Sequence, residues 1–346
     1  MNMGLRRRVM LIYTGGTIGM IKNRETGTLE PLDFENVRQH VPELNELDYD
    51  IRALQFQPPI DSSDMRPVHW ARLVRCIAEH YEEVDGFVIL HGTDTMAYTA
   101  SALSFMLDGL TKPVILTGSQ LPIGVLRTDG KENLISAIEL AAATNEKGHP
   151  MVPEVCVYFG STLLRGNRST KASAERFDAF ASYNFPPLAT VGININYNRK
   201  AILQPSAHQA LKPHTEMDNS VIAITLFPGI RPQIIEHVFE MPDVRGIILR
   251  TYGSGNAPQQ PWLLNAIRNA TDEDKVVVNI TQCDAGSVEM RLYETGNQLL
   301  KAGVVSGGDM TVECATTKLM FLLAQELSPE EVRQKMKTPL AGEISQ

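Results

Sequence analysis

The sequence YTGGTIGM at residues 13–20 follows directly on the apolar run VMLI at residues 9–12. A short apolar run that ends abruptly in glycines is typical of a buried parallel strand leading into a tight turn. Backbone N–H groups in such a turn can approach a ligand closely, because glycine has no Cβ. The hydroxyls of Thr14 and Thr17 favour nucleophilic chemistry over phosphate binding, since the turn lacks both the dinucleotide-binding and the P-loop glycine patterns. A purely structural turn is the alternative.

The same pattern recurs along the first half of the chain. The run GFVIL at residues 86–90 ends in HGTDTM at 91–96, and PVIL at 113–116 ends in TGSQ at 117–120. Pro67 opens a helix that the apolar spacing predicts to run to about Glu82. Strands alternating with helices predict a parallel sheet covered on both faces. Because ligands bind outside the carboxyl ends of such strands, the polar clusters are expected to converge on one pocket.

The length of 346 residues predicts two domains. We place an N-terminal domain at residues 1–190, a linker at 191–219 where the apolar periodicity is lost, and a smaller α/β domain at 220–346. Ser328-Pro329-Glu330-Glu331 predicts a capping box at the start of the last helix.

Composition excludes several classes of partner. The formal net charge of -8 argues against a nucleic acid, and no apolar run approaches the roughly 20 residues that span a bilayer. The basic cluster Arg6-Arg7-Arg8 runs into a strand too short for the core of an export signal. The cysteines lie far apart without metal-ligand spacing, which predicts reduced thiols, no metal site and a cytoplasmic protein.

Four segments together resemble the bacterial-type L-asparaginases, most closely their cytoplasmic type I branch. They are Thr14–Gly19, the run DSSDM at 61–65, HGTDT at 91–95, and the pair Thr170-Lys171. The resemblance covers nearly the whole chain and includes YGSGNAP at 252–258. It implies hydrolysis of L-asparagine to L-aspartate and ammonia without metal or cofactor. It also implies a flavodoxin-like N-terminal domain, a smaller Rossmann-like α/β domain, and active sites between the subunits of a homodimer or homotetramer.

The resemblance implies a catalytic set and a substrate-binding set of residues. The catalytic set consists of the nucleophile Thr17 and a group formed by Thr93, Asp94 and Lys171. The substrate-binding set consists of Asp61, Ser62, Ser63, Thr93 and Asp94. Without the resemblance, Thr93 and Asp94 are equally suited to capping the next helix, and a lysine after a polar loop is usually solvated.

The chemistry asks for these residue types independently. Amide hydrolysis needs a nucleophile, a proton acceptor and donors aimed at the developing oxyanion. Burial favours a neutral Lys171 that can take a proton from Thr93, whereas Asp94 favours the ammonium, and the sequence leaves both open. Peptide N–H groups around Gly16, Thr17 and Thr93 are the expected oxyanion donors, each contributing about 3 kcal/mol in the transition state.

One departure from the family pattern concerns the loop after the first motif, where the family usually has a tyrosine. Residues 21–32 contain none, so Thr28 or a residue elsewhere would assist Thr17, and the loop from Ile21 to Asp33 is a candidate lid. Some type I enzymes are activated by asparagine at a second site. Candidate effector residues here are Thr170, Arg250 and Cys283.

Two other functions compete with this interpretation. The first is the asparaginase-like subunit of an archaeal-type tRNA-dependent amidotransferase, which carries an extra N-terminal domain and is disfavoured by the acidic charge. The second is a non-catalytic module that binds nucleotides or amino acids. The paired hydroxyls and Lys171 argue against such a module, because binding alone needs no nucleophile.

Overall fold

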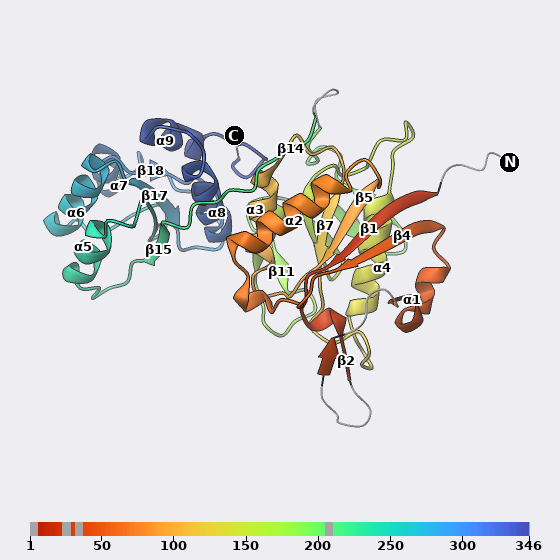
Figure 1. Cartoon of the computed structure of the whole chain (residues 1–346). Helices are drawn as coiled ribbons and strands as arrows, with labels where there is room; N and C mark the ends of the chain where they lie inside the picture. The colour runs from red at the N-terminus through yellow and green to blue at the C-terminus, as the bar shows by residue number, and fades with distance from the viewer. Residues whose placement is uncertain (1–5, 23–28, 32–36, 205–209, 346) are drawn as a thin grey trace. The chain divides into compact units, whose positions relative to one another are not determined.

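The computed structural model describes residues 6–22, 29–31, 37–204 and 210–345 (Figure 1). The chain divides into two units, Met1–Thr215 and Glu216–Gln346. Within the described ranges, no helix is long and apolar enough to cross a membrane.

The first unit is built on an eight-stranded sheet with the order β13-β12-β9-β8-β7-β5-β1-β4. Its strands are β1 (Arg7–Tyr13), β4 (Tyr49–Gln55), β5 (Gly86–Leu90), β7 (Val114–Thr117), β8 (Val155–Phe159), β9 (Thr162–Arg165), β12 (Ala189–Val191) and β13 (Ile195–Tyr197). β5, β7 and β8 are buried along their whole length, as expected of parallel strands with both faces covered.

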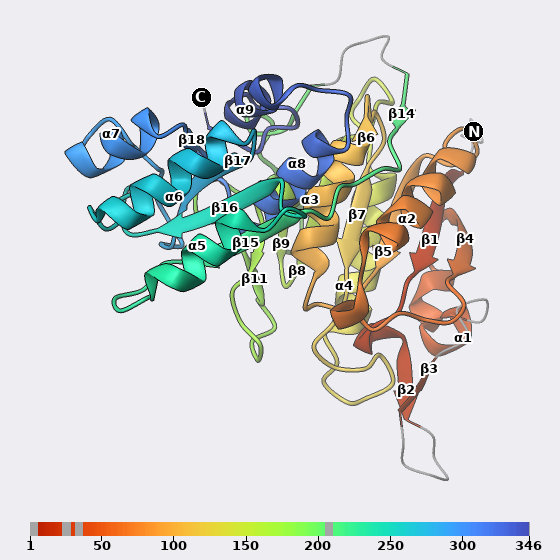
Figure 2. The same cartoon turned by 60° about the vertical axis from the view of Figure 1, so that its left-hand side comes forward.

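Helices cover both faces of this sheet. Figures 1 and 2 show α2 (Pro67–Glu79) and α3 (Met96–Met106) on one face and α4 (Gly130–Ala142) on the other. α4 packs against β1, β5 and β7, and its apolar side chains share a core with those of the short helix α1 (Val37–His40). The described part of the first unit also contains three antiparallel pairs. They are β2 (Met20–Lys22) with β3 (Leu29–Pro31), β6 (Leu107–Asp108) with β14 (Lys212–Pro213), and β10 (Thr170–Lys171) with β11 (Phe180–Ala181).

The order of the parallel strands confirms the flavodoxin-like prediction. In chain order these strands are β1, β4, β5, β7 and β8, and in space they follow the sequence 2-1-3-4-5. β9, β12 and β13 extend the sheet in antiparallel pairings. Residues 191–219, which the sequence predicts as a linker, contain β13 and β14. Strands of two or three residues are too short to give a recognisable period in the sequence.

The second unit is a four-stranded parallel sheet with helices on both faces, as predicted for a smaller α/β domain. The strand order is β15-β16-β17-β18, and α5 and α6 pack together while α8 packs on β15 and β16. The elements are β15 (Val221–Thr225), α5 (Pro232–Glu240), β16 (Gly246–Thr251), α6 (Pro261–Asp272), β17 (Val276–Thr281), α7 (Glu294–Lys301), β18 (Val305–Ser306), α8 (Val312–Leu323) and α9 (Pro329–Lys337). The predicted capping box of Ser328 and Glu331 opens α9.

A buried ion pair fixes the segment after α9 to α8. Lys318 and Glu343 have fully buried side chains, and Lys318 Nζ lies 2.5 Å from Glu343 Oε1. Lys318 also donates to the carbonyls of Met336 and Thr338, at 3.2 and 2.7 Å. The Glu343 carboxylate accepts the backbone N–H of Leu340 at 3.0 Å. Burial lowers the pKa of Lys318, and Glu343 opposes that shift.

Candidate active site

The first glycine-rich turn places Thr17 at the carboxyl end of β1. Gly16 has a φ of 94°, a region that favours glycine, and the chain then enters a 3-10 helix at Thr17–Gly19. A Cβ on Gly16 would lie 2.5 Å from the Cα of Gly92, so the two strand-end turns touch at their backbones. The half-buried Thr17 and Thr93 each follow one of these touching glycines.

The segment DSSDM packs against the second turn. A Cβ on Gly92 would lie 2.5 Å from Ser62 Oγ, and Thr95 Oγ1 donates to the carbonyl of Ser62 at 2.6 Å. Ser62 is buried. The contacts therefore bring Ser62 against the backbone beside Thr93.

Asp61 and Ser63 form a local hydrogen-bonded unit. Asp61 Oδ1 accepts the backbone N–H of Ser63 at 2.9 Å and the hydroxyl of Ser63 at 2.7 Å. These bonds lower the pKa of Asp61, with the backbone bond as the larger cause. Both residues are exposed, so a carboxylate and a hydroxyl are presented to solvent next to Ser62.

Lys171 joins this site from a distant part of the sequence. It lies on β10, which packs beside α3, and its Nζ donates to Thr93 Oγ1 at 2.8 Å and to Asp94 Oδ1 at 2.7 Å. Its side chain is 18% exposed, whereas that of Asp94 is 65% exposed. The structure thus brings Thr93, Asp94 and Lys171 into one hydrogen-bonded group.

A buried histidine, His91, contacts the backbone of the second turn. His91 was not predicted from the sequence as a site residue. His91 Nδ1 lies 2.6 Å from the carbonyl oxygen of Gly92, and its Nε2 lies 2.9 Å from Thr99 Oγ1. Thr99 Oγ1 in turn accepts the indole N–H of Trp70 at 3.0 Å. Burial lowers the pKa of His91 to about 4, so the ring is neutral near pH 7. The sequence feature that could have identified His91 is its place as the first residue of the motif HGTDT.

The candidate effector residues do not all lie in one unit. Thr170 precedes Lys171 on β10 in the first unit. Arg250 is on β16 and Cys283 follows β17, in the second unit, where these strands are neighbours. Cys283 is exposed. Thr28 and most of the candidate lid lie outside the described residues.

Two further features of the described residues are the positions of the cysteines and the grouping of side chains that could bind a metal ion. Cys76, Cys156 and Cys314 are buried, and none of the four cysteines, all of which lie within the described ranges, takes part in a disulfide. Among the described residues, no cluster of three or more His, Cys, Asp or Glu side chains could hold a metal ion.

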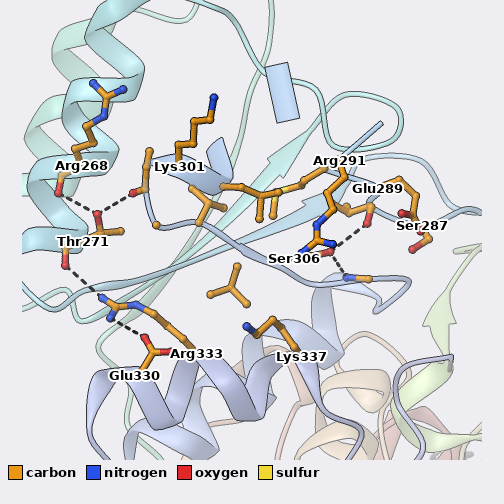
Figure 3. A pocket seen from close by; sticks show the side chains of 18 of the residues that line it. Arg268, Thr271, Ser287, Glu289, Arg291, Lys301, Ser306, Glu330, Arg333 and Lys337 are labelled. Atoms are coloured by element: carbon orange, nitrogen blue, oxygen red, sulfur yellow. Dashed lines mark hydrogen bonds and ion pairs between the residues drawn. The ribbon is translucent and has the colours of Figure 1, made fainter. Parts of the chain in front are cut away.

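A pocket of about 830 Å³ lies in the second unit, apart from the predicted site residues (Figure 3). Arg333 reaches across from α9 and donates to the carbonyl of Thr271 on α6 at 3.2 Å. The exposed cations Lys301 and Lys337 also line the pocket. None of the predicted catalytic, substrate-binding or effector residues lines it, so it is not the candidate active site.

Comparisons with known proteins point to the same protein family over both units of the chain. Residues 8–203 match the family model "Asparaginase, N-terminal", and residues 220–336 match "Glutaminase/Asparaginase C-terminal domain". L-asparaginase 1 of Escherichia coli K12 is 46% identical over 349 residues, covering 98% of each chain. The mouse 60 kDa lysophospholipase is 41% identical over 367 residues, covering 99% of this chain and 63% of its own. The crystal structure of L-asparaginase I from Vibrio cholerae matches with a TM-score of 0.87 and 43% identity, covering 99% of this chain and 100% of that one. The chain therefore belongs to the asparaginase family.

Proposed function

We propose that this protein is an L-asparaginase that hydrolyses L-asparagine to L-aspartate and ammonia, with Thr17 as the nucleophile. The observation that carries the proposal is the hydrogen bond of Lys171 to Thr93, beside the turn that carries Thr17. Two threonine hydroxyls, one of them bonded to an amine, supply a nucleophile and a route for its proton. The identity to L-asparaginase 1 over nearly the full length supports the same reaction.

The proposed reaction proceeds in two steps. The Thr17 hydroxyl oxygen attacks the side-chain amide carbon, forming a C–O bond and placing charge on the carbonyl oxygen. The C–N bond then breaks, and the proton lost by Thr17 leaves on ammonia after passing through the Thr93–Lys171 group. Water hydrolyses the resulting ester, which releases L-aspartate and restores Thr17.

The α-ammonium group of the substrate needs a negatively charged partner, and its α-carboxylate needs hydrogen-bond donors. The exposed carboxylates of Asp61 and Asp94 suit the ammonium. The hydroxyl of Ser62 suits the carboxylate, and that of Ser63 does so when it turns from Asp61 to the substrate. We expect no metal or cofactor to take part.

The experiment that tests the proposal measures ammonia release from L-asparagine and L-glutamine over a wide range of concentration. We expect turnover of asparagine in the absence of added metal or cofactor. The two amides differ by one methylene, which a pocket distinguishes by only about 1 to 3 kcal/mol, so the assay compares kcat/KM for both. Absence of ammonia release from both amides would overturn the proposal.

Lys171→Met is expected to lower kcat for asparagine by at least about 100-fold, the low end of the range for a group that assists proton transfer. Methionine is unbranched and only one atom shorter than lysine, but it cannot donate to Thr93 or Asp94. Steady-state kinetics at saturating asparagine measure the effect, and circular dichroism checks that the variant is folded. A kcat within threefold of the wild-type value would show that Lys171 has no part in the reaction.

Further proposals concern regulation and assembly. Activation by a second molecule of asparagine is proposed, with Thr170, Arg250 and Cys283 as the candidate effector residues and with Thr170 acting on the adjoining Lys171. Such activation makes the rate curve sigmoidal, and a strictly hyperbolic curve contradicts it. We also propose a homodimer or homotetramer and, because the cysteines form no disulfide within the described ranges, a cytoplasmic location.

A further inference from the structure

Tyr13, the last residue of β1, lies beneath the turn that carries Thr17. Its side chain is fully buried, and its hydroxyl donates to the carbonyl oxygen of Gly16 at 3.3 Å. A Cβ on Gly19 would lie 2.3 Å from Tyr13 Cζ, so the turn rests directly on the ring. The ring and its hydroxyl therefore contact the turn from the core side.

The bond to the Gly16 carbonyl also sets the direction of the next N–H. In a trans peptide the C=O and N–H bonds point in opposite directions, and the only cis peptide among the described residues is Gln57–Pro58. The Gly16 carbonyl accepts the hydroxyl of Tyr13 and also the Gly19 N–H of the 3-10 helix, at 3.2 Å, so the N–H of Thr17 points away from both donors. Within the described ranges, that N–H donates to no protein atom.

The neighbouring turn is built in the same way. The carbonyl oxygen of Gly92 can only accept, so His91 Nδ1 carries the ring proton and donates it to this carbonyl. In the neutral ring Nε2 is then the acceptor, so the Thr99 hydroxyl donates to it while accepting the indole N–H of Trp70. The N–H of Thr93 then points away from His91. Each candidate threonine is thus preceded by a glycine whose carbonyl is held by a buried aromatic side chain.

We propose that Tyr13 is a positioning residue that holds the Gly16 carbonyl and so aims the Thr17 N–H at the oxygen on which charge develops. The inference rests on the proposed hydrolysis at Thr17, where such N–H groups are the expected oxyanion donors. Tyr13 touches neither substrate nor reacting atoms in this role. Its contribution appears in the transition state, where the oxygen becomes negative, more than in substrate binding.

The test compares Tyr13→Phe with a matched change elsewhere in the same sheet. Tyr158, on β8, is also buried, and its hydroxyl donates to the carbonyl of Gly160 at 3.4 Å, a glycine that precedes neither candidate threonine. We expect Tyr13→Phe to lower kcat for asparagine about tenfold with KM changed less than twofold, a part of the loss seen when an oxyanion donor is removed outright. Tyr158→Phe is expected to keep the wild-type kcat. Equal kcat values in the two variants, or an effect on KM alone, would overturn the inference.

The pH dependence separates positioning from proton transfer. Burial raises the pKa of Tyr13 to about 12, so its hydroxyl stays protonated over the working range of an enzyme. We therefore expect the Tyr13→Phe variant to keep the shape of the wild-type profile of kcat against pH at a lower level. Loss of one limb of that profile would show that Tyr13 takes the proton of Thr17, against the inference.

Crystal structures of the two variants give a readout that does not depend on activity. The Gly16–Thr17 peptide is expected to rotate or to adopt two orientations in Tyr13→Phe and to stay in place in Tyr158→Phe. An unmoved peptide in Tyr13→Phe would refute the inference even if asparagine is hydrolysed. A moved peptide together with a wild-type protein that releases no ammonia would instead refute the proposed function.

Discussion

Thr17→Val is expected to lower kcat for ammonia release from asparagine by at least about a thousandfold, and more if background hydrolysis is negligible. Valine has the shape of threonine but no hydroxyl, so the C–O bond of the proposed intermediate cannot form. Thr17 is half-buried at the start of a short 3-10 helix, and no hydrogen bond of its hydroxyl is found within the described part of the chain. Folding is therefore expected to survive the change.

Thr14→Val is the matched control, because it removes the other hydroxyl of the same motif. Thr14 Oγ1 donates to the carbonyl of Leu90 at 3.0 Å and is buried, so this hydroxyl joins β1 to β5. The same carbonyl also accepts the Thr14 N–H, at 3.0 Å, and remains paired in the variant. We expect kcat to change less than fivefold. Equal losses in the two variants would mean that the motif is a structural turn.

Breaking the buried pair of Lys318 and Glu343 is expected to have the largest effect on stability. Lys318→Met or Glu343→Gln leaves one charged or polar group without its partner in a fully buried site, which costs about 3 to 5 kcal/mol in the free energy of unfolding. That is a large part of the 5 to 15 kcal/mol typical of a domain. Hydrogen exchange of the amides of β15, β16 and α8 measures the loss within the second unit.

Two controls separate the buried charge from the loss of a side chain. The double variant Lys318→Met/Glu343→Gln leaves no unpaired charge, so part of the lost stability is expected to return. Lys131→Met removes an exposed partner of Glu43, at 3.1 Å, and is expected to cost less than about 1 kcal/mol. A single variant at position 318 that costs no more than Lys131→Met would contradict the importance of the buried pair.

The sequence predicted the parallel strands because they are buried on both faces. The run at 86–90 is a strand with the predicted bounds, and the helix at Pro67 ends at Glu79, close to the predicted Glu82. The capping box of Ser328 was also predictable, since its partners lie three residues apart. These elements were predictable because they depend on the spacing of apolar residues and on hydrogen bonds between residues close together in the sequence.

Contacts between distant residues were not predictable from local pattern. Nothing near Lys318 indicates a carboxylate 25 residues further along the chain. The group of Thr93, Asp94 and Lys171 was predicted only through the family resemblance, because 78 residues separate Lys171 from Thr93. Tyr13 was missed for another reason, since its hydroxyl bonds a backbone carbonyl and any buried strand end can carry a tyrosine.

The pair of Lys318 and Glu343 also bears on the order in which the chain acquires its structure during synthesis. All five parallel strands of the first sheet lie before residue 160, so this sheet can form on the ribosome while later residues are still being added. α8 is complete at Leu323, but its buried lysine lacks a counter-charge until Glu343 has left the exit tunnel. The second unit therefore completes its folding only after Glu343 has emerged. An arrested nascent chain that stops short of Glu343 should present α8 to chaperones and proteases while its first sheet is already resistant.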